Sequence, residues 1–189
     1  MTNYPNWFEY VRPNFEEFLT PLAGQDRLRF LQIGVFTGDA SVWLASNILT
    51  GEATYLLDID TWQGSKEEVH SKMDFADVYK VYKEKTEPYS HIITSSIGDS
   101  TIYLQSLHSN FHFAYIDGDH TTVGVILDAE LAWQRLFSGG IMAFDDYTWQ
   151  HESGDPRLAP TVGIDLFLHR HQGDYQLLVK NNQVWIKKK

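Results

Sequence analysis

The sequence contains no cysteine, few basic side chains and no long apolar run, and each shortage excludes a class of protein. Without cysteine there is no disulfide, no thiolate metal site and no cysteine nucleophile. Fifteen lysines and arginines against 25 aspartates and glutamates give a formal net charge of −10, which disfavours binding to nucleic acid phosphates. No apolar stretch approaches the roughly 20 residues of a membrane helix, and the N-terminus lacks a signal-peptide pattern. We therefore expect a cytoplasmic protein that binds neither nucleic acid nor membrane.

What remains is the composition of a globular protein. The 189 residues are 43% hydrophobic and 21% charged, which is enough apolar material for a sizeable core. The absence of repeats, linkers and low-complexity tracts predicts a single domain over residues 1–189. Residues 1–24 form an aromatic-rich extension with a short helix expected at 15–19. The oligomeric state is left open by the sequence, a homo-oligomer included.

Apolar strand-like runs alternate with helical segments along most of the chain. This alternation is typical of α/β proteins with a parallel sheet. Near the C-terminus two strand-like runs flank Asn181 and Asn182, a plausible hairpin turn. The sequence therefore predicts a Rossmann-like, mostly parallel seven-stranded sheet with helices on both faces and an antiparallel C-terminal hairpin. The strands are expected at 29–34, 53–59, 91–95, 113–116, 141–144, 175–179 and 184–187, and helices at 40–48, within 66–85, at 100–107, after Asp117 and at 161–169.

Two of the predicted strands end in acidic residues. Asp117 follows the apolar run 113–116, and Asp145 and Asp146 follow 141–144. A helix between these strands makes them parallel, and as neighbours they would lie about 5 Å apart. Three carboxylates at one edge of a sheet repel unless they share a proton or a cation, and oxygen ligands suit Mg²⁺, with Mn²⁺ or Ca²⁺ as alternatives. His120 would stand over the same edge as a candidate general base.

Three shorter motifs precede this cluster. Gly34 and Gly38 form a glycine turn between the first strand and the first long helix, with G-x-x-x-G spacing rather than the spacing of dinucleotide binders. Either Asp58 or Asp60 could bind ribose hydroxyls after the second strand, or cap a helix instead. The turn of Asp99 and Ser100 could face an adenine, but a helix N-cap explains it equally well.

Together the motifs LQIGVFTGDASVWLA, LLDIDTWQGS, IGDS, YIDGDH and FDDY resemble the class I S-adenosylmethionine-dependent methyltransferases, specifically their metal-dependent O-methyltransferase-like group. The resemblance covers roughly residues 29–147. Gln32 is a departure, because the family usually has an acid there that helps to hold the cofactor's ammonium group. The resemblance implies a catalytic base at His120; cofactor-binding residues Gln32, Gly34, Gly38, Asp60, Asp58, Asp99, Ser100 and Asp117; and metal ligands Asp117, Asp145 and Asp146.

The expected function is therefore metal-assisted methyl transfer from S-adenosylmethionine to a hydroxyl group of a small substrate. The long loop 147–160 and the residues Trp62, Trp149 and His151 could contact that substrate. Three other functions stay open: a nucleotide-dependent hydride transfer, a metal-dependent hydrolase, and a degenerate relative that binds a partner without catalysis. The sequence does not identify the methyl acceptor.

Overall fold

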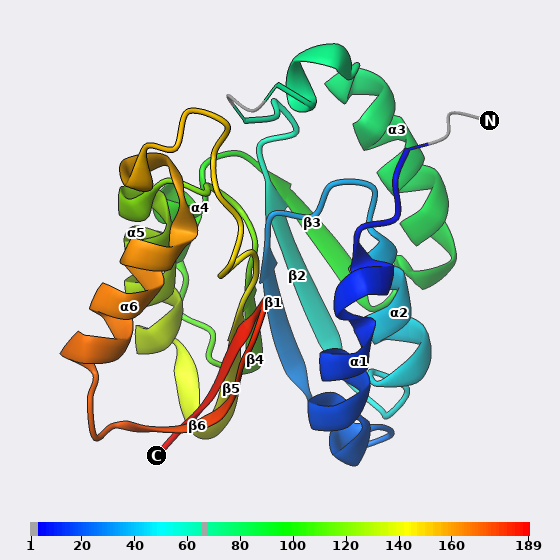
Figure 1. The fold of residues 1–189 in the computed structure, drawn as a ribbon. Helices are drawn as coiled ribbons and strands as arrows, with labels where there is room; N and C mark the ends of the chain where they lie inside the picture. Colours follow the sequence, from blue (N-terminus) through cyan, green and yellow to red (C-terminus); the bar gives the residue numbers. More distant parts are fainter. Residues whose placement is uncertain (1–3, 66–67) are drawn as a thin grey trace.

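The computed structural model describes residues 4–65 and 68–189, and its centre is a seven-stranded sheet covered by helices on both faces (Figure 1). The strand order is β3-β2-β1-β4-β5-β7-β6. The first five strands run parallel, and β7 pairs antiparallel with both β5 and β6. This confirms the predicted sheet and its terminal hairpin. The strands are β1 Arg29–Ile33, β2 Tyr55–Asp60, β3 Ile93–Ile97, β4 Phe111–Ile116, β5 Leu136–Phe144, β6 Tyr175–Lys180 and β7 Val184–Lys188.

Helices cover the sheet in two groups of three, separated by the sheet itself (Figure 1). In one group the first two helices pack beside Phe30 and Phe113, and the third packs against Val35 and Trp62. The other group packs beside Leu31 and Ala114, so neighbouring residues of one strand face opposite cores. Burial on both faces is why the central strands are almost continuously apolar. The first group is α1 Phe8–Leu19, α2 Asp39–Asn47 and α3 Phe75–Thr86; the second is α4 Ser100–Ser106, α5 Thr122–Gln134 and α6 Pro160–Arg170. Short 3₁₀ helices occur at Thr20–Leu22, His70–Lys72, Glu87–Tyr89 and Pro156–Leu158.

The direction of strand succession reverses at β1, which lies between β2 and β4. In open α/β sheets the loops diverge at such a reversal and leave a crevice at the carboxyl ends of the strands. Backbone hydrogen bonds join the carboxyl ends of β4, β1 and β2. Asp117 N donates to Ile33 O over 2.8 Å, and Gly34 N donates to Ile59 O over 2.9 Å. The sheet topology therefore brings together motifs that are more than 80 residues apart.

Two elements, α1 and β5, begin well before their predicted starts, and most other boundaries shift by one or two residues. Helix α1 begins at Phe8 rather than near residue 15, because Phe8, Val11, Phe15 and Leu19 have helical spacing and are all buried. Strand β5 begins at Leu136, which pairs with Phe111 before a register shift. Helix α3, which begins at Phe75 after the N-cap Asp74, agrees with the prediction that the stretch 66–85 is helical in part; residues 66 and 67 of that stretch lie outside the described residues.

Across residues 4–65 and 68–189, none of the helices combines the length and the apolar character that crossing a bilayer requires.

Candidate active site

A pocket of about 640 Å³ lies at the carboxyl edge of the sheet, where the strand order reverses. This size falls within the usual range for small-molecule and cofactor sites. The pocket runs along the ends of β1, β2, β3 and β4, where it is lined by Gly34, Asp60, Asp99 and Gly118 respectively. The loops after β2 and β5 close its outer side, contributing Gln63, Gly64, Ser65, Trp149, His151 and Leu158.

The turn from Gly34 to Gly38, which we call the glycine loop, packs closely against the end of β4. Gly34 has φ +78°, and a Cβ built there would lie 1.8 Å from the carbonyl oxygen of Asp117. Only glycine fits this position, for both conformational and steric reasons. Gly38 also has a positive φ, +80°, but it starts α2 and faces Tyr82 rather than the pocket. Of the two predicted glycines, Gly34 therefore borders the pocket and Gly38 shapes the loop behind it.

Gln32 supports this loop from below. Its side chain is buried, donates to Gly34 O over 3.1 Å and accepts from Ser41 Oγ over 3.3 Å. It is not part of the pocket lining. In this arrangement the amide at position 32 holds the glycine loop in place.

The two candidate acids of β2 have different surroundings. Asp60 borders the pocket, and its carboxylate accepts hydrogen bonds from Val35 N over 2.7 Å, Phe36 N over 3.0 Å and Trp62 N over 2.7 Å. It thus connects the glycine loop to the loop after β2. Asp58 is fully buried beneath the loop and accepts from Tyr82 Oη over 2.9 Å. Position favours Asp60 as the residue that meets a ligand.

The burial of Asp58 predicts a pH-dependent stability. Desolvation raises the pKa of Asp58 to about 7, against 3.8 for an unperturbed aspartate. The folded protein therefore keeps a proton that the unfolded chain releases, so the stabilising contribution is complete below pH 3.8 and is lost as the pH rises through 7. We expect Asp58→Asn to exceed the wild type in unfolding free energy at pH 8, by up to about 4 kcal/mol, with a smaller gap at pH 5. Urea unfolding across this pH range checks the prediction, and parallel curves for the two proteins would contradict it.

The turn after β3 contains a helix cap that also borders the pocket. Asp99 is the N-cap of α4 and accepts from Thr101 N over 2.8 Å. Hydrogen bonds from the Thr101 side chain and backbone lower the pKa of Asp99. Ser100 donates through its hydroxyl to Asp128 on α5. Asp99 therefore caps a helix, as one interpretation predicted, and it also borders the pocket, as the other interpretation requires.

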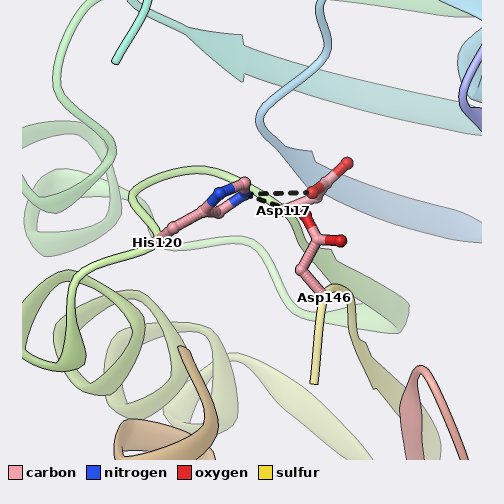
Figure 2. Close-up of side chains that lie close together, drawn as sticks. All are labelled: Asp117, His120 and Asp146. Carbon is pink, nitrogen blue, oxygen red and sulfur yellow. Dashed lines mark ion pairs between the residues drawn. The ribbon is translucent and has the colours of Figure 1, made fainter. Parts of the chain in front are cut away.

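Two acids and a histidine meet beside the pocket (Figure 2), and of the three His120 is the one that belongs to the pocket lining. The Nε2 atom of His120 lies 3.2 Å from Asp146 Oδ2 and 3.7 Å from Asp117 Oδ1. Potential ligand atoms of the three residues all lie within 4.8 Å of one another. Burial, and then the charge of Asp145, raise the pKa of Asp117 well above its usual range. A cation or a proton held here would relieve this accumulation of negative charge.

Asp145 faces a different set of partners. Its carboxylate accepts from the Tyr115 hydroxyl, from Gln183 Nε2 over 3.2 Å and from the backbone N of Asp146 over 2.8 Å. Burial raises the pKa of Asp145, although these hydrogen bonds oppose the rise. Asp146 itself adopts a left-handed backbone conformation, with φ +54°. The structure thus groups His120 with Asp117 and Asp146, and it directs Asp145 towards the core.

Trp149 and Trp62, both predicted as candidates for contact with the substrate, have different surroundings in the structure. The Trp149 ring lies 5.1 Å from the His120 ring, centroid to centroid, and borders the pocket. Trp62 is buried against Tyr79 and Tyr82, and its indole donates to Phe36 O over 3.0 Å. Trp149 therefore belongs to the pocket, whereas Trp62 stabilises the loop that forms it.

Sequence reasoning missed Asp128 and Gln183. Asp128 borders the pocket from α5, and Gln183 holds Asp145 from the start of the terminal strand. A signal existed for Asp128, because it stands three residues after Val125 and four before Ala132, on the apolar face of its helix. No comparable signal identifies Gln183, which reaches Asp145 only through the pairing of β7 with β5.

A seven-stranded sheet of this order, with a pocket at the reversal point, is the fold of the class I methyltransferases. The chain belongs to the family described as "Methyltransferase domain", whose model matches residues 31–147. This confirms the resemblance drawn from the five sequence motifs. No curated protein sequence matches the chain.

Solved structures share this fold at low sequence identity. MycE methyltransferase from the mycinamycin biosynthetic pathway, in complex with Mg, SAH and mycinamycin VI, has a TM-score of 0.68 and 17% identity; the match covers 98% of this chain and 50% of MycE. The O-methyltransferase from Bacillus cereus in complex with SAH has a TM-score of 0.64 and 16% identity, with 98% and 82% covered. An rRNA methylase from Streptococcus thermophilus has a TM-score of 0.58 and 13% identity, with 100% and 98% covered.

Proposed function

We propose that the protein transfers a methyl group from S-adenosylmethionine to a hydroxyl oxygen of a small molecule, assisted by a divalent cation. The observation that carries this proposal is the position of His120, which borders the pocket and has its Nε2 atom 3.2 Å from an oxygen of Asp146 and 3.7 Å from an oxygen of Asp117. The family assignment supports the donor, as do the SAH complexes of the Bacillus cereus enzyme and MycE. The magnesium ion of the MycE complex supports the cation.

The two reactants would occupy different parts of the pocket. Asp60 would bind the cofactor's ribose, and Asp99 and Ser100 would lie near the adenine. His120, Trp149 and His151 border the other region, which would receive the acceptor. Because transfer from sulfonium to oxygen is an in-line displacement, the principal task of these residues is to align two bound molecules.

His120 would remove the proton from the acceptor hydroxyl. Its Nε2 is the ring atom directed at the acids, and once the two carboxylates held a cation this nitrogen would be unprotonated and able to accept the proton. Asp117 and Asp146 would hold the cation, which favours the ionised form of a hydroxyl bound to it. Asp145 stays a predicted ligand from the resemblance; in the observed geometry it anchors Asp146 through that residue's backbone N–H. Mg²⁺ fits the two carboxylates best, since hard cations prefer oxygen ligands.

Removing the cation is expected to abolish turnover. Protein dialysed against EDTA should lose methyl transfer and regain it with Mg²⁺ or Mn²⁺. Because Asp117 and Asp146 would hold the ion, the double variant Asp117→Asn/Asp146→Asn should stay inactive at every metal concentration. Asp174→Asn, on an exposed residue, is the matched control and should behave as the wild type. Full activity in EDTA would contradict metal assistance, while leaving methyl transfer itself intact.

The proposed function is tested with S-adenosylhomocysteine binding and a panel of acceptors. Calorimetry should detect binding of the product cofactor, and radiolabelled donor should methylate at least one catechol, sugar or small hydroxy compound. A short RNA belongs in the panel because the Streptococcus thermophilus neighbour is named an rRNA methylase. The net charge of −10 predicts that RNA will not be methylated. Hydrolytic turnover without the donor would instead favour a metal-dependent hydrolase.

A further inference from the structure

A buried acid on α5 borders the pocket and has no role in the chemistry described above. Asp128 is only 3% exposed, yet its carboxyl group lies at the pocket surface, beside the ends of β3 and β4. Aspartate is rarely buried in the middle of an apolar helix unless a partner satisfies it. Its surroundings therefore show what kind of group it is suited to bind.

One oxygen of this carboxylate is satisfied within the protein and the other is not. Oδ1 accepts a hydrogen bond from the Ser100 hydroxyl, whereas Oδ2 accepts none from the described part of the chain. Gly118 faces Oδ2, and a Cβ built on Gly118 would lie 3.3 Å from that oxygen. Because glycine has no side chain, nothing from position 118 covers the free oxygen. An oxygen that opens into a pocket from an otherwise buried side chain is suited to accept a hydrogen bond from a donor on a ligand.

The neighbouring acids, Asp99 and Asp119, differ from Asp128 because both are exposed. Asp99 uses Oδ1 to cap α4, accepting from both the backbone N and the hydroxyl of Thr101. Asp119 similarly accepts from Thr121 N over 2.8 Å at the start of α5. Of these three acids, Asp128 alone combines deep burial, a position on the pocket and an oxygen without a hydrogen bond from the described residues.

We propose that Asp128 Oδ2 accepts a hydrogen bond from the exocyclic amino group of the cofactor's adenine, which makes it a specificity-determining residue for the base. This assignment rests on the proposed function, because it takes the ligand to be S-adenosylmethionine. Apart from its link to ribose, the adenine ring carries one N–H donor group, the amino group, while its ring nitrogens accept. Burial raises the pKa of Asp128 to about 7, so at pH 8.5 its carboxylate is ionised and can only accept, and the amino group is its complement. Ile59 and Leu127, which also border the pocket, supply apolar contacts for the ring faces.

The test compares S-adenosylhomocysteine with two analogues by calorimetry at pH 8.5. One analogue has hydrogen and the other a carbonyl oxygen in place of the exocyclic amino group. The wild type is expected to bind both analogues roughly 10- to 100-fold more weakly, the usual effect of one hydrogen bond to a charged group. Asp128→Leu is expected to weaken S-adenosylhomocysteine binding to a similar degree and to remove the preference over the hydrogen analogue.

Asp174→Asn is the matched control, because it also removes one carboxylate, on an exposed residue outside the pocket lining. This variant should keep the wild-type preference for the amino group. Equal binding of all three ligands by the wild type would overturn the assignment, even if Asp128→Leu failed to fold. Retention of the wild-type preference by folded Asp128→Leu would overturn it too. If the wild type bound none of the three ligands, the proposed function itself would fail, which is a different result from unselective binding.

Discussion

Replacing His120 with alanine is expected to slow methyl transfer roughly 10²- to 10⁴-fold, the usual contribution of a general base. The physical reason is the position of its Nε2 atom, 3.2 Å from Asp146 at the end of the pocket where the acceptor would bind. The loss should appear in kcat, measured at saturating donor and acceptor. The affinity for S-adenosylhomocysteine should stay unchanged, because His120 acts on the acceptor and not on the donor.

Two further measurements separate a base from a metal ligand, since His120 lies close enough to the two acids to serve as either. If it is a base, Mn²⁺ titration will give the same affinity in His120→Ala as in the wild type, and added imidazole will restore part of the rate. If it is a ligand, Mn²⁺ affinity will fall instead. His91→Ala, on an exposed histidine before β3, is the control and should be fully active. An unchanged kcat in His120→Ala would contradict the proposed mechanism.

The second large effect is expected from Gly34→Ala. A Cβ at this position would lie 1.8 Å from Asp117 O and 2.4 Å from the Asp117 carbonyl carbon. Backbone atoms cannot yield as a flexible side chain can, so the ends of β1 and β4 must separate. We expect the variant to lose more than about 4 kcal/mol of unfolding free energy, the range reserved for severe structural conflicts. Any folded fraction should also lose S-adenosylhomocysteine binding, because the loop on the cofactor side of the pocket is displaced.

Gly139→Ala isolates the contribution of the clash. Gly139 has φ +81°, close to the +78° of Gly34, but a Cβ there would meet nothing within 4 Å. Alanine at Gly139 should therefore show only the cost of a left-handed conformation, about 1–2 kcal/mol. Chemical denaturation of the two variants measures the difference directly. Equal losses of stability would show that strain, and not contact with β4, explains the requirement for glycine at position 34.

Much of the fold follows from local patterns in the sequence. Apolar runs, glycine turns and helical spacing predicted the alternating strands and helices, and the acidic ends of β4 and β5 predicted that carboxylates would gather at one edge. These signals are readable because burial on both faces imposes a continuous apolar run, and a tight turn requires glycine. The boundaries of α1 and β5 were less predictable, since they depend on packing and pairing with distant segments.

The sequence by itself determined the sheet, its terminal hairpin and the residues that could meet at its carboxyl edge. Only the tertiary structure decided what each of those side chains faces. Asp145 and Asp146 are adjacent in the chain, yet one is held by Tyr115 and Gln183 while the other contacts His120. Asp128 borders the pocket because α5 packs against the turn that carries Ser100. A carboxylate's direction depends on partners brought close by strand order and helix packing, and these long-range contacts leave no local pattern in the sequence.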